Sequence, residues 1–118
     1  MALNDGYLGQ TQIAPESWIK DTYDVSDEDR AAGAASVNAD ATHERFIDGF
    51  TGYRSFWWQF DAAQGERVAM GVHGQVIYVN RAKNLVIANF ASPEVTANQL
   101  RPTFKQMLAG TRALAASF

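Results

Sequence analysis

The sequence RVAMGVHGQVIYVN, residues 67–80, shows the most regular alternation of side chains in the chain. In a β-strand, successive side chains point to opposite faces, so residues two apart share a face. One face of this stretch carries mainly apolar residues: Val68, Met70, Val72, Gly74, Val76 and Tyr78. The alternation predicts one continuous strand over 67–80, with a small polar cluster of His73, Gly74 and Gln75 inside it.

Two further strands are predicted on either side of this one. YRSFWWQF (53–60) is dense in aromatic residues, which favour strands, and LVIANFAS (85–92) is apolar enough to be buried on both faces. The links DAAQGE and RAKN are short and polar, as turns are. Because strands joined by short links pair with their chain neighbours, we predict a three-stranded antiparallel meander.

A C-terminal helix is predicted to cover this sheet. Apolar residues recur at helical spacing between 100 and 116, and Pro102 is tolerated in a first helical turn. The stripe consists of Leu100, Phe104, Met107, Leu108, Thr111 and Ala115. The fold class is therefore α+β, with the sheet and its helix in residues 52–118.

Residues 1–51 are predicted to form a helical and irregular segment that belongs to the same partial domain. APESWIKDTY (14–23) has Pro15 where a first helical turn accepts it, and Ser26 precedes three acidic residues, as a helix start often does. ATHERFID (41–48) is a candidate for a further helical turn. We expect no strand before Gly52.

The bulk composition excludes several functions. The chain has 118 residues, a net charge of −3 and ten scattered Lys and Arg residues, which make no electrostatic footprint for nucleic acid. It has no cysteine, and its two histidines, His43 and His73, have no metal-ligand spacing, so no metal or other cofactor is expected. No apolar run approaches the about 20 residues of a membrane helix. The composition leaves the cellular compartment open.

The cluster of His73, Gly74 and Gln75 has two interpretations. In the first, the strand forms the wall of a cleft, where glycine admits a ligand, backbone N–H groups bond an oxyanion and His73 orients the substrate. In the second, the strand is bulged and His73 is a buried, hydrogen-bonded core residue. The spacing of the residues alone does not separate these alternatives.

Three ordered segments resemble the C-terminal third of the β-lactamase-related serine hydrolases. They are ALNDGYLGQTQIAPESWI (2–19), GYRSFWW (52–58) and GVHGQVIYVNRAKNLVIANFAS (71–92). Among these hydrolases the chain is most similar to the branch of esterases and 6-aminohexanoate-dimer hydrolases. The resemblance runs from Ala2 to Phe118 and implies part of a β-lactamase-like α/β domain.

The resemblance also implies site residues. In penicillin-recognising enzymes the equivalent strand carries a K-T-G motif and donates one oxyanion N–H. Gly74 would then keep the strand open to the acyl group, Gln75 would supply the N–H, and His73 would line the pocket. Trp57 and Trp58 would lie on the neighbouring strand, where each side chain would either pack in the core or line the pocket. The lysine of K-T-G is absent, so an ester or short amide substrate fits better than a β-lactam.

The nucleophile of this family is missing from the chain. The family needs an S-x-x-K pair and a Y-x-N or S-x-N element. Ser17 and Lys20 have the first spacing and Ser36-Val37-Asn38 the second, but only 15 residues lie between Lys20 and Ser36, too few for the intervening helical domain. We therefore reject both and assign no catalytic residue to this chain.

Three functions follow from these observations. The chain is expected to be the C-terminal fragment of a serine hydrolase, inactive alone. The alternatives are a non-catalytic binding or structural module that retains the sheet, and an enzyme that uses His73 with Asp61 or Glu66. The resemblance implies a five-stranded sheet, of which this chain is predicted to supply three strands. One edge and one face would then be uncovered, so we expect a homo-oligomer or docking onto the missing N-terminal portion.

Overall fold

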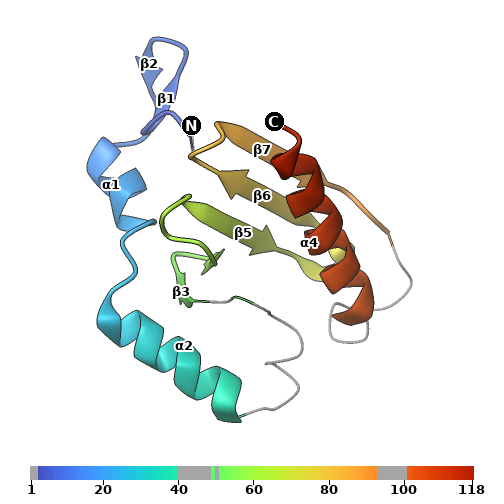
Figure 1. Ribbon diagram of the computed structural model, residues 1–118. Coiled ribbons are helices and arrows are strands. Elements are labelled where there is room, and N and C mark those ends of the chain that lie inside the picture. Colours follow the sequence, from blue (N-terminus) through green and yellow to red (C-terminus); the bar gives the residue numbers. More distant parts are fainter. Residues whose placement is uncertain (1–2, 40–48, 50, 93–100) are drawn as a thin grey trace.

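The computed structural model describes residues 3–39, 49, 51–92 and 101–118, and it shows an α+β fold (Figure 1). Five strands form one antiparallel sheet whose order, β3-β4-β5-β6-β7, is the order of the chain. The strands are β3 (Gly52–Arg54), β4 (Trp57–Gln59), β5 (Glu66–Met70), β6 (Val76–Asn80) and β7 (Leu85–Asn89). The sheet is antiparallel, as predicted, but it has five strands where three were predicted.

The first additional strand arises because residues 53–60 fold back on themselves. Ser55 and Phe56 both have positive φ, 49° and 69°, and they join β3 to β4. Two consecutive left-handed residues are typical of a type I′ turn, whose twist matches that of paired strands. Such turns normally use Asn or Gly, so the residues at this turn gave no indication that the chain reverses.

The second additional strand arises in the same way within residues 67–80. The chain turns between Met70 and Val76, which are directly opposite each other in the β5–β6 pair. Residues opposite each other in an antiparallel pair lie on the same face of the sheet. A hairpin in this register therefore places Val68, Met70, Val76 and Tyr78 on one face, as a continuous strand would, and alternation alone could not distinguish the two.

Strand β7 lies at the edge of the sheet, and only one of its faces is covered. Its residues alternate between half-buried and exposed, with Val86 46% exposed. The prediction that both faces of this strand are buried is therefore wrong. Pairing with β6 accounts for one edge of β7, and no other strand among the described residues pairs with the outer edge.

The C-terminal helix α4 (Arg101–Ala116) crosses one face of the sheet, as predicted (Figure 1). Leu108 and Ala115 are buried against a core that contains Phe60, Val68, Val76 and Tyr78. Fully burying an apolar side chain such as Leu108 contributes roughly 1.5–3 kcal/mol, so this layer stabilises the fold. Leu100, the first residue of the predicted stripe, lies outside the described residues.

The N-terminal segment contains α1 (Glu16–Asp21), α2 (Asp27–Ala39) and a hairpin of β1 (Tyr7–Leu8) and β2 (Thr11–Gln12). The prediction of no strand before Gly52 is therefore wrong. The helix start at Ser26 is confirmed, since the Ser26 hydroxyl accepts from the Asp29 amide at 3.0 Å and the Ser26 amide donates to the Asp29 carboxylate at 3.0 Å. This reciprocal pair is a capping box. The predicted turn at 41–48 lies outside the described residues.

Helix α1 packs against the face of the sheet opposite α4. Ile19 of α1 is buried, and Gln59 of β4 donates from Nε2 to the carbonyl oxygen of Thr22 at 2.9 Å. Val79, on the same face of the sheet, is fully buried. This contact covers only the end of the face near Arg67 and Val79. Farther along, Ile77 and Val86 remain 43% and 46% exposed.

Candidate functional site

The three predicted site residues His73, Gly74 and Gln75 lie in the turn between β5 and β6 rather than inside a strand. Residues Val72–Gly74 form a single 3₁₀ turn. The loop that contains this turn is closed by a hydrogen bond from the Gly71 amide to the Gln75 carbonyl oxygen at 2.8 Å. His73 has φ 56° and ψ 34°, and Gly74 has φ 74°. Left-handed conformations cost a non-glycine residue about 1–2 kcal/mol, so the turn at His73 is strained.

The turn is anchored by side chains that bond its backbone. Asn89 of β7 donates from Nδ2 to the Gly74 carbonyl oxygen at 3.0 Å. The Gln75 side-chain amide donates to the carbonyl oxygen of Ala91 and, at 3.3 Å, to that of His73. Sequence reasoning assigned a role only to the backbone of Gln75 and assigned none to Asn89. These bonds fix the shape of a loop whose outer residues face solvent.

Solvent reaches this turn directly. Gly71, Val72 and His73 are exposed, while Gly74 and Gln75 are half-buried. The prediction of an accessible cluster is therefore compatible with the structure, and the alternative of a buried core histidine is wrong. The backbone amide of Gln75 donates to the Val72 carbonyl oxygen at 3.5 Å, which is at the limit of hydrogen bonding. This N–H group therefore forms only a weak hydrogen bond.

The two tryptophans of β4 point to opposite faces of the sheet. Trp58 packs against the core under α4 and meets Tyr53 edge-to-face, with ring centroids 4.9 Å apart. Trp57 lies on the other face, where its ring stacks on the guanidinium of Arg67 at 4.2 Å. Both rings are therefore engaged in packing, and the two cannot line one common pocket.

The acids considered as partners of His73 lie far from it. Glu66 begins β5 and His73 follows its end, so the two are separated by a strand of about 16 Å. Asp61 instead accepts from the backbone amides of Ala63 and Gln64, at 2.9 and 3.2 Å, in the β4–β5 loop. A catalytic pair of His73 with either acid is therefore wrong.

The rejected nucleophile candidates also lie apart from the turn. Ser17 and Lys20 lie on α1, which contacts the sheet at the beginning of β5, and Lys20 forms an ion pair with Asp24. Ser36 and Asn38 belong to α2. The structure thus gives no reason to bring either motif to the turn of residues 71–75.

A buried arginine that sequence reasoning did not single out joins α1 to the sheet. Arg67 is 1% exposed, and its guanidinium lies 3.5 Å from the ring centroid of Tyr23 and 4.2 Å from that of Trp57. It donates to the hydroxyl and carbonyl oxygens of Thr22, while its Nε has no hydrogen-bond partner among the described residues. Burial lowers the pKa of Arg67 to about 10. The alternation of the strand places Arg67 on this face, but nothing in the sequence indicates that the face is covered.

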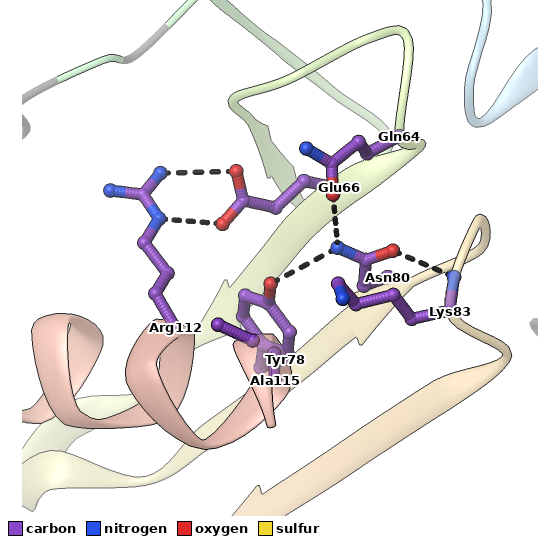
Figure 2. A pocket seen from close by; sticks show the side chains of 8 residues that line it. Gln64, Glu66, Tyr78, Asn80, Lys83, Arg112 and Ala115 are labelled. Atoms are coloured by element: carbon purple, nitrogen blue, oxygen red, sulfur yellow. Dashed lines mark hydrogen bonds and ion pairs between the residues drawn. The ribbon is translucent and has the colours of Figure 1, made fainter. Parts of the chain in front are cut away.

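A second site lies between the end of α4 and the ends of β5 and β6 (Figure 2). It is a pocket of about 240 Å³ whose polar lining comes from Gln64, Glu66, Tyr78, Asn80, Lys83 and Arg112. Arg112 of α4 holds Glu66 through two hydrogen bonds of 2.6 and 3.1 Å. Burial raises the pKa of the Tyr78 phenol, so that it stays protonated at neutral pH.

Asn80 organises the other side of this pocket. Its Nδ2 donates to Oε1 of Gln64 at 3.0 Å and to the Tyr78 hydroxyl at 3.4 Å, and its Oδ1 accepts from the Lys83 amide at 3.0 Å. Asn80 is 2% exposed, so these bonds satisfy a buried amide. Sequence reasoning missed this pocket, because its residues come from three separate stretches of the chain, 64–66, 78–83 and 112–116, with no common motif.

No group of three or more potential metal-ligating side chains occurs within the part of the chain that the structure describes. In the same residues, no helix has the length and apolar character needed to cross a bilayer.

In comparisons with known proteins, no family model, curated protein or solved structure matches the chain.

Proposed function

We propose that this chain is the C-terminal part of a serine hydrolase that acts on ester or short amide substrates. The observation that supports it best is the turn of residues 71–75, where Gln75 is half-buried beside the exposed residues Val72 and His73 and its backbone amide has only one bond, of 3.5 Å. An oxyanion hole requires such a preorganised but uncommitted backbone donor. The order of the sequence motifs, described above, is the second support.

Each residue of the turn has a role in this proposal. Gly74 has no side chain to obstruct an acyl group, and its left-handed φ favours glycine. Gln75 supplies the N–H, while its side-chain bond to Ala91 holds that N–H in place. His73 is exposed beside them and orients the substrate. The lysine of the K-T-G motif is missing, so the substrate lacks the carboxylate that this lysine would bind.

The nucleophile would come from protein outside this chain. One edge of the sheet, and the part of one face that α1 does not cover, are available for docking such a portion. Phe90 is 84% exposed, Val86 46% and Ile77 43%, and β7 ends the sheet without a further partner among the described strands. Open apolar edges of this kind normally pair with another chain or segment. The chain alone is therefore expected to be inactive and to associate with the missing portion or with itself.

The alternative function is a non-catalytic binding or structural module, and the same exposed apolar face favours it. The two proposals differ in one respect, which is whether the turn of residues 71–75 contacts a reacting substrate. In a binding module, Ile77, Val86 and Phe90 would carry the function and the turn would be an ordinary connection.

The reading frame upstream of the Met1 codon provides the first test. An in-frame S-x-x-K and Y-x-N supports the hydrolase, and the extended polypeptide is then assayed with an activated short-chain ester. Gln75 has φ −71°, which proline adopts without strain, so Gln75→Pro removes the N–H alone from the backbone. Loss of one oxyanion donor reduces kcat by about 10²–10³.

Gln75→Ala is the matched control, because it removes the same side chain and keeps the backbone N–H. It should retain kcat within about tenfold of the parent, since only the anchoring bond to Ala91 is lost. Equal activity of the two variants would remove the oxyanion role. An upstream frame without the two motifs would favour the binding module instead.

A further inference from the structure

The pocket beside Glu66 and Asn80 is separate from the turn proposed for acyl transfer. It lies at the beginning of β5 and the end of β6, whereas the turn joins the other ends of these strands. Its volume of about 240 Å³ is slightly below the range of drug-sized sites, which favours a small ligand. The inference drawn from it does not depend on the proposed hydrolase function.

The walls of the pocket are held in place before any ligand binds. Two hydrogen bonds from Arg112 hold the Glu66 carboxylate in place. The Asn80 side chain is held by its hydrogen bonds to Gln64, Tyr78 and the backbone amide of Lys83. A binding site whose groups already occupy their positions loses little conformational freedom when a ligand enters. The pocket is thus preorganised.

The ammonium group of Lys83 is the uncompensated charge of the site. It has no ion-pair partner among the described residues, and Figure 2 shows its side chain extending into the pocket between Asn80 and Tyr78. Glu66 and Arg112 neutralise each other. Counting Glu66 as −1 and Arg112 and Lys83 as +1 each, the lining carries a net charge of +1.

We propose that this pocket binds a small monocarboxylate with a short aliphatic chain. Its carboxylate pairs with Lys83, in a pocket that the guanidinium of Arg112 also lines. A cation would meet the unpaired ammonium, and a dianion such as phosphate would meet the Glu66 carboxylate with only one net positive charge to balance it. One negative charge matches this lining best.

The remaining surface of the pocket suits the aliphatic chain of the ligand. Ala115 and Ala116 of α4 contribute methyl groups to the lining, and the Tyr78 ring lies beside Ala115 (Figure 2). These side chains offer apolar contact and no additional hydrogen-bonding groups apart from the Tyr78 hydroxyl, which already accepts from Asn80. A ligand of about six carbons therefore has its charge at Lys83 and its chain along α4.

Titration of ¹⁵N-labelled protein with sodium hexanoate tests the proposal. Saturable shifts are expected at the backbone amides of Gln64, Glu66, Lys83 and Arg112, with hexanamide, the uncharged analogue, binding more weakly. Lys83→Gln should weaken hexanoate binding about three- to fivefold, the range of an exposed ion pair. Lys20→Gln is the matched control, because Lys20 is an exposed lysine on α1, and it should leave binding unchanged.

A second variant tests the position of the aliphatic chain. Ala116 is exposed at the pocket mouth, so Ala116→Leu narrows the pocket without disturbing the core and should abolish the hexanoate shifts. Shifts that do not saturate, that are equal for hexanamide, or that survive both Lys83→Gln and Ala116→Leu would overturn the proposal. Tighter binding of inorganic phosphate than of hexanoate would also overturn it.

Discussion

Replacement of Arg67 by methionine should leave the stability of the protein nearly unchanged, although Arg67 is among its most deeply buried side chains. Methionine keeps an unbranched stem between the rings of Tyr23 and Trp57 and removes the charge. Thr22 keeps its remaining bonds, because its hydroxyl donates to Ile19 and its carbonyl oxygen accepts from Gln59.

The opposing free energies can be compared from the structure. Burial lowers the pKa of Arg67 to about 10, well below the ordinary value of an arginine. At about 1.4 kcal/mol per pKa unit, this lowering corresponds to about 3 kcal/mol against the buried charge. At neutral pH arginine is charged in both the folded and the unfolded states, so this cost applies in full. The two aromatic rings return about 1–2 kcal/mol each, and the contributions cancel within about 1 kcal/mol.

Urea denaturation, followed by far-ultraviolet circular dichroism, measures the free energy of unfolding of each variant. Arg67→Met should lie within about 1 kcal/mol of the parent, as apolar replacements of buried charges often do. Arg67→Ala, the matched control, should lose about 3–4 kcal/mol, because it leaves a cavity between two rings. A loss of more than about 2 kcal/mol in Arg67→Met would show that the charge itself stabilises the fold and would refute this comparison.

Three further predictions concern other parts of the molecule. Gly6→Ala places a Cβ 2.0 Å from the Ala14 carbonyl oxygen, whereas the Cβ of the control Gly9→Ala meets nothing within 4 Å. Gly6→Ala should therefore destabilise the protein by at least about 2 kcal/mol more than Gly9→Ala, and equal melting temperatures of the two variants would contradict the close approach. Hydrogen bonds from the Ser26 hydroxyl and amide lower the pKa of Asp29, so the stabilising effect of Asp29 is complete above the ordinary aspartate pKa and is lost as the pH falls through the lower pKa of the folded state. A plot of the free energy of unfolding against pH should lack this loss in Asp29→Asn, and parallel plots for variant and parent would argue against it. Val86→Lys, at the open edge, should reduce self-association measured by size exclusion with light scattering; a parent protein that is already a monomer would end the proposal of a homo-oligomer.

The sequence predicted the composition of the core better than the path of the chain. Val68, Val76 and Tyr78 face α4 as the alternation indicated. The chain reversals were missed because the turn at Ser55 and Phe56 uses residues that rarely take positive φ, and because the turn after Met70 preserves the alternation on both sides. Periodicity specifies which face a residue occupies, whereas the position of a turn depends on backbone conformations that these residue types do not reveal.

The site could be predicted only where its residues are neighbours in the chain. His73, Gly74 and Gln75 form one group at the turn, with His73 exposed and the other two half-buried, and the sequence placed them together, although in a strand rather than in a turn. The role of Asn89 in holding Gly74 and the pocket of Glu66, Asn80 and Arg112 depend on contacts between distant segments. Such contacts follow from strand register and helix placement, which the sequence pattern left open.

The strands of the sheet pair in the order in which they occur in the chain, and this has a consequence for folding. Each of the four strand pairings closes a short connection, so the entropy lost in bringing partners together is small at every step. The sheet can therefore assemble rapidly by adding one hairpin after another as the polypeptide is synthesised. The face of the sheet that α4 covers stays open until α4, which follows β7 in the chain, is complete. During that interval the nascent chain is most exposed to chaperones and to aggregation.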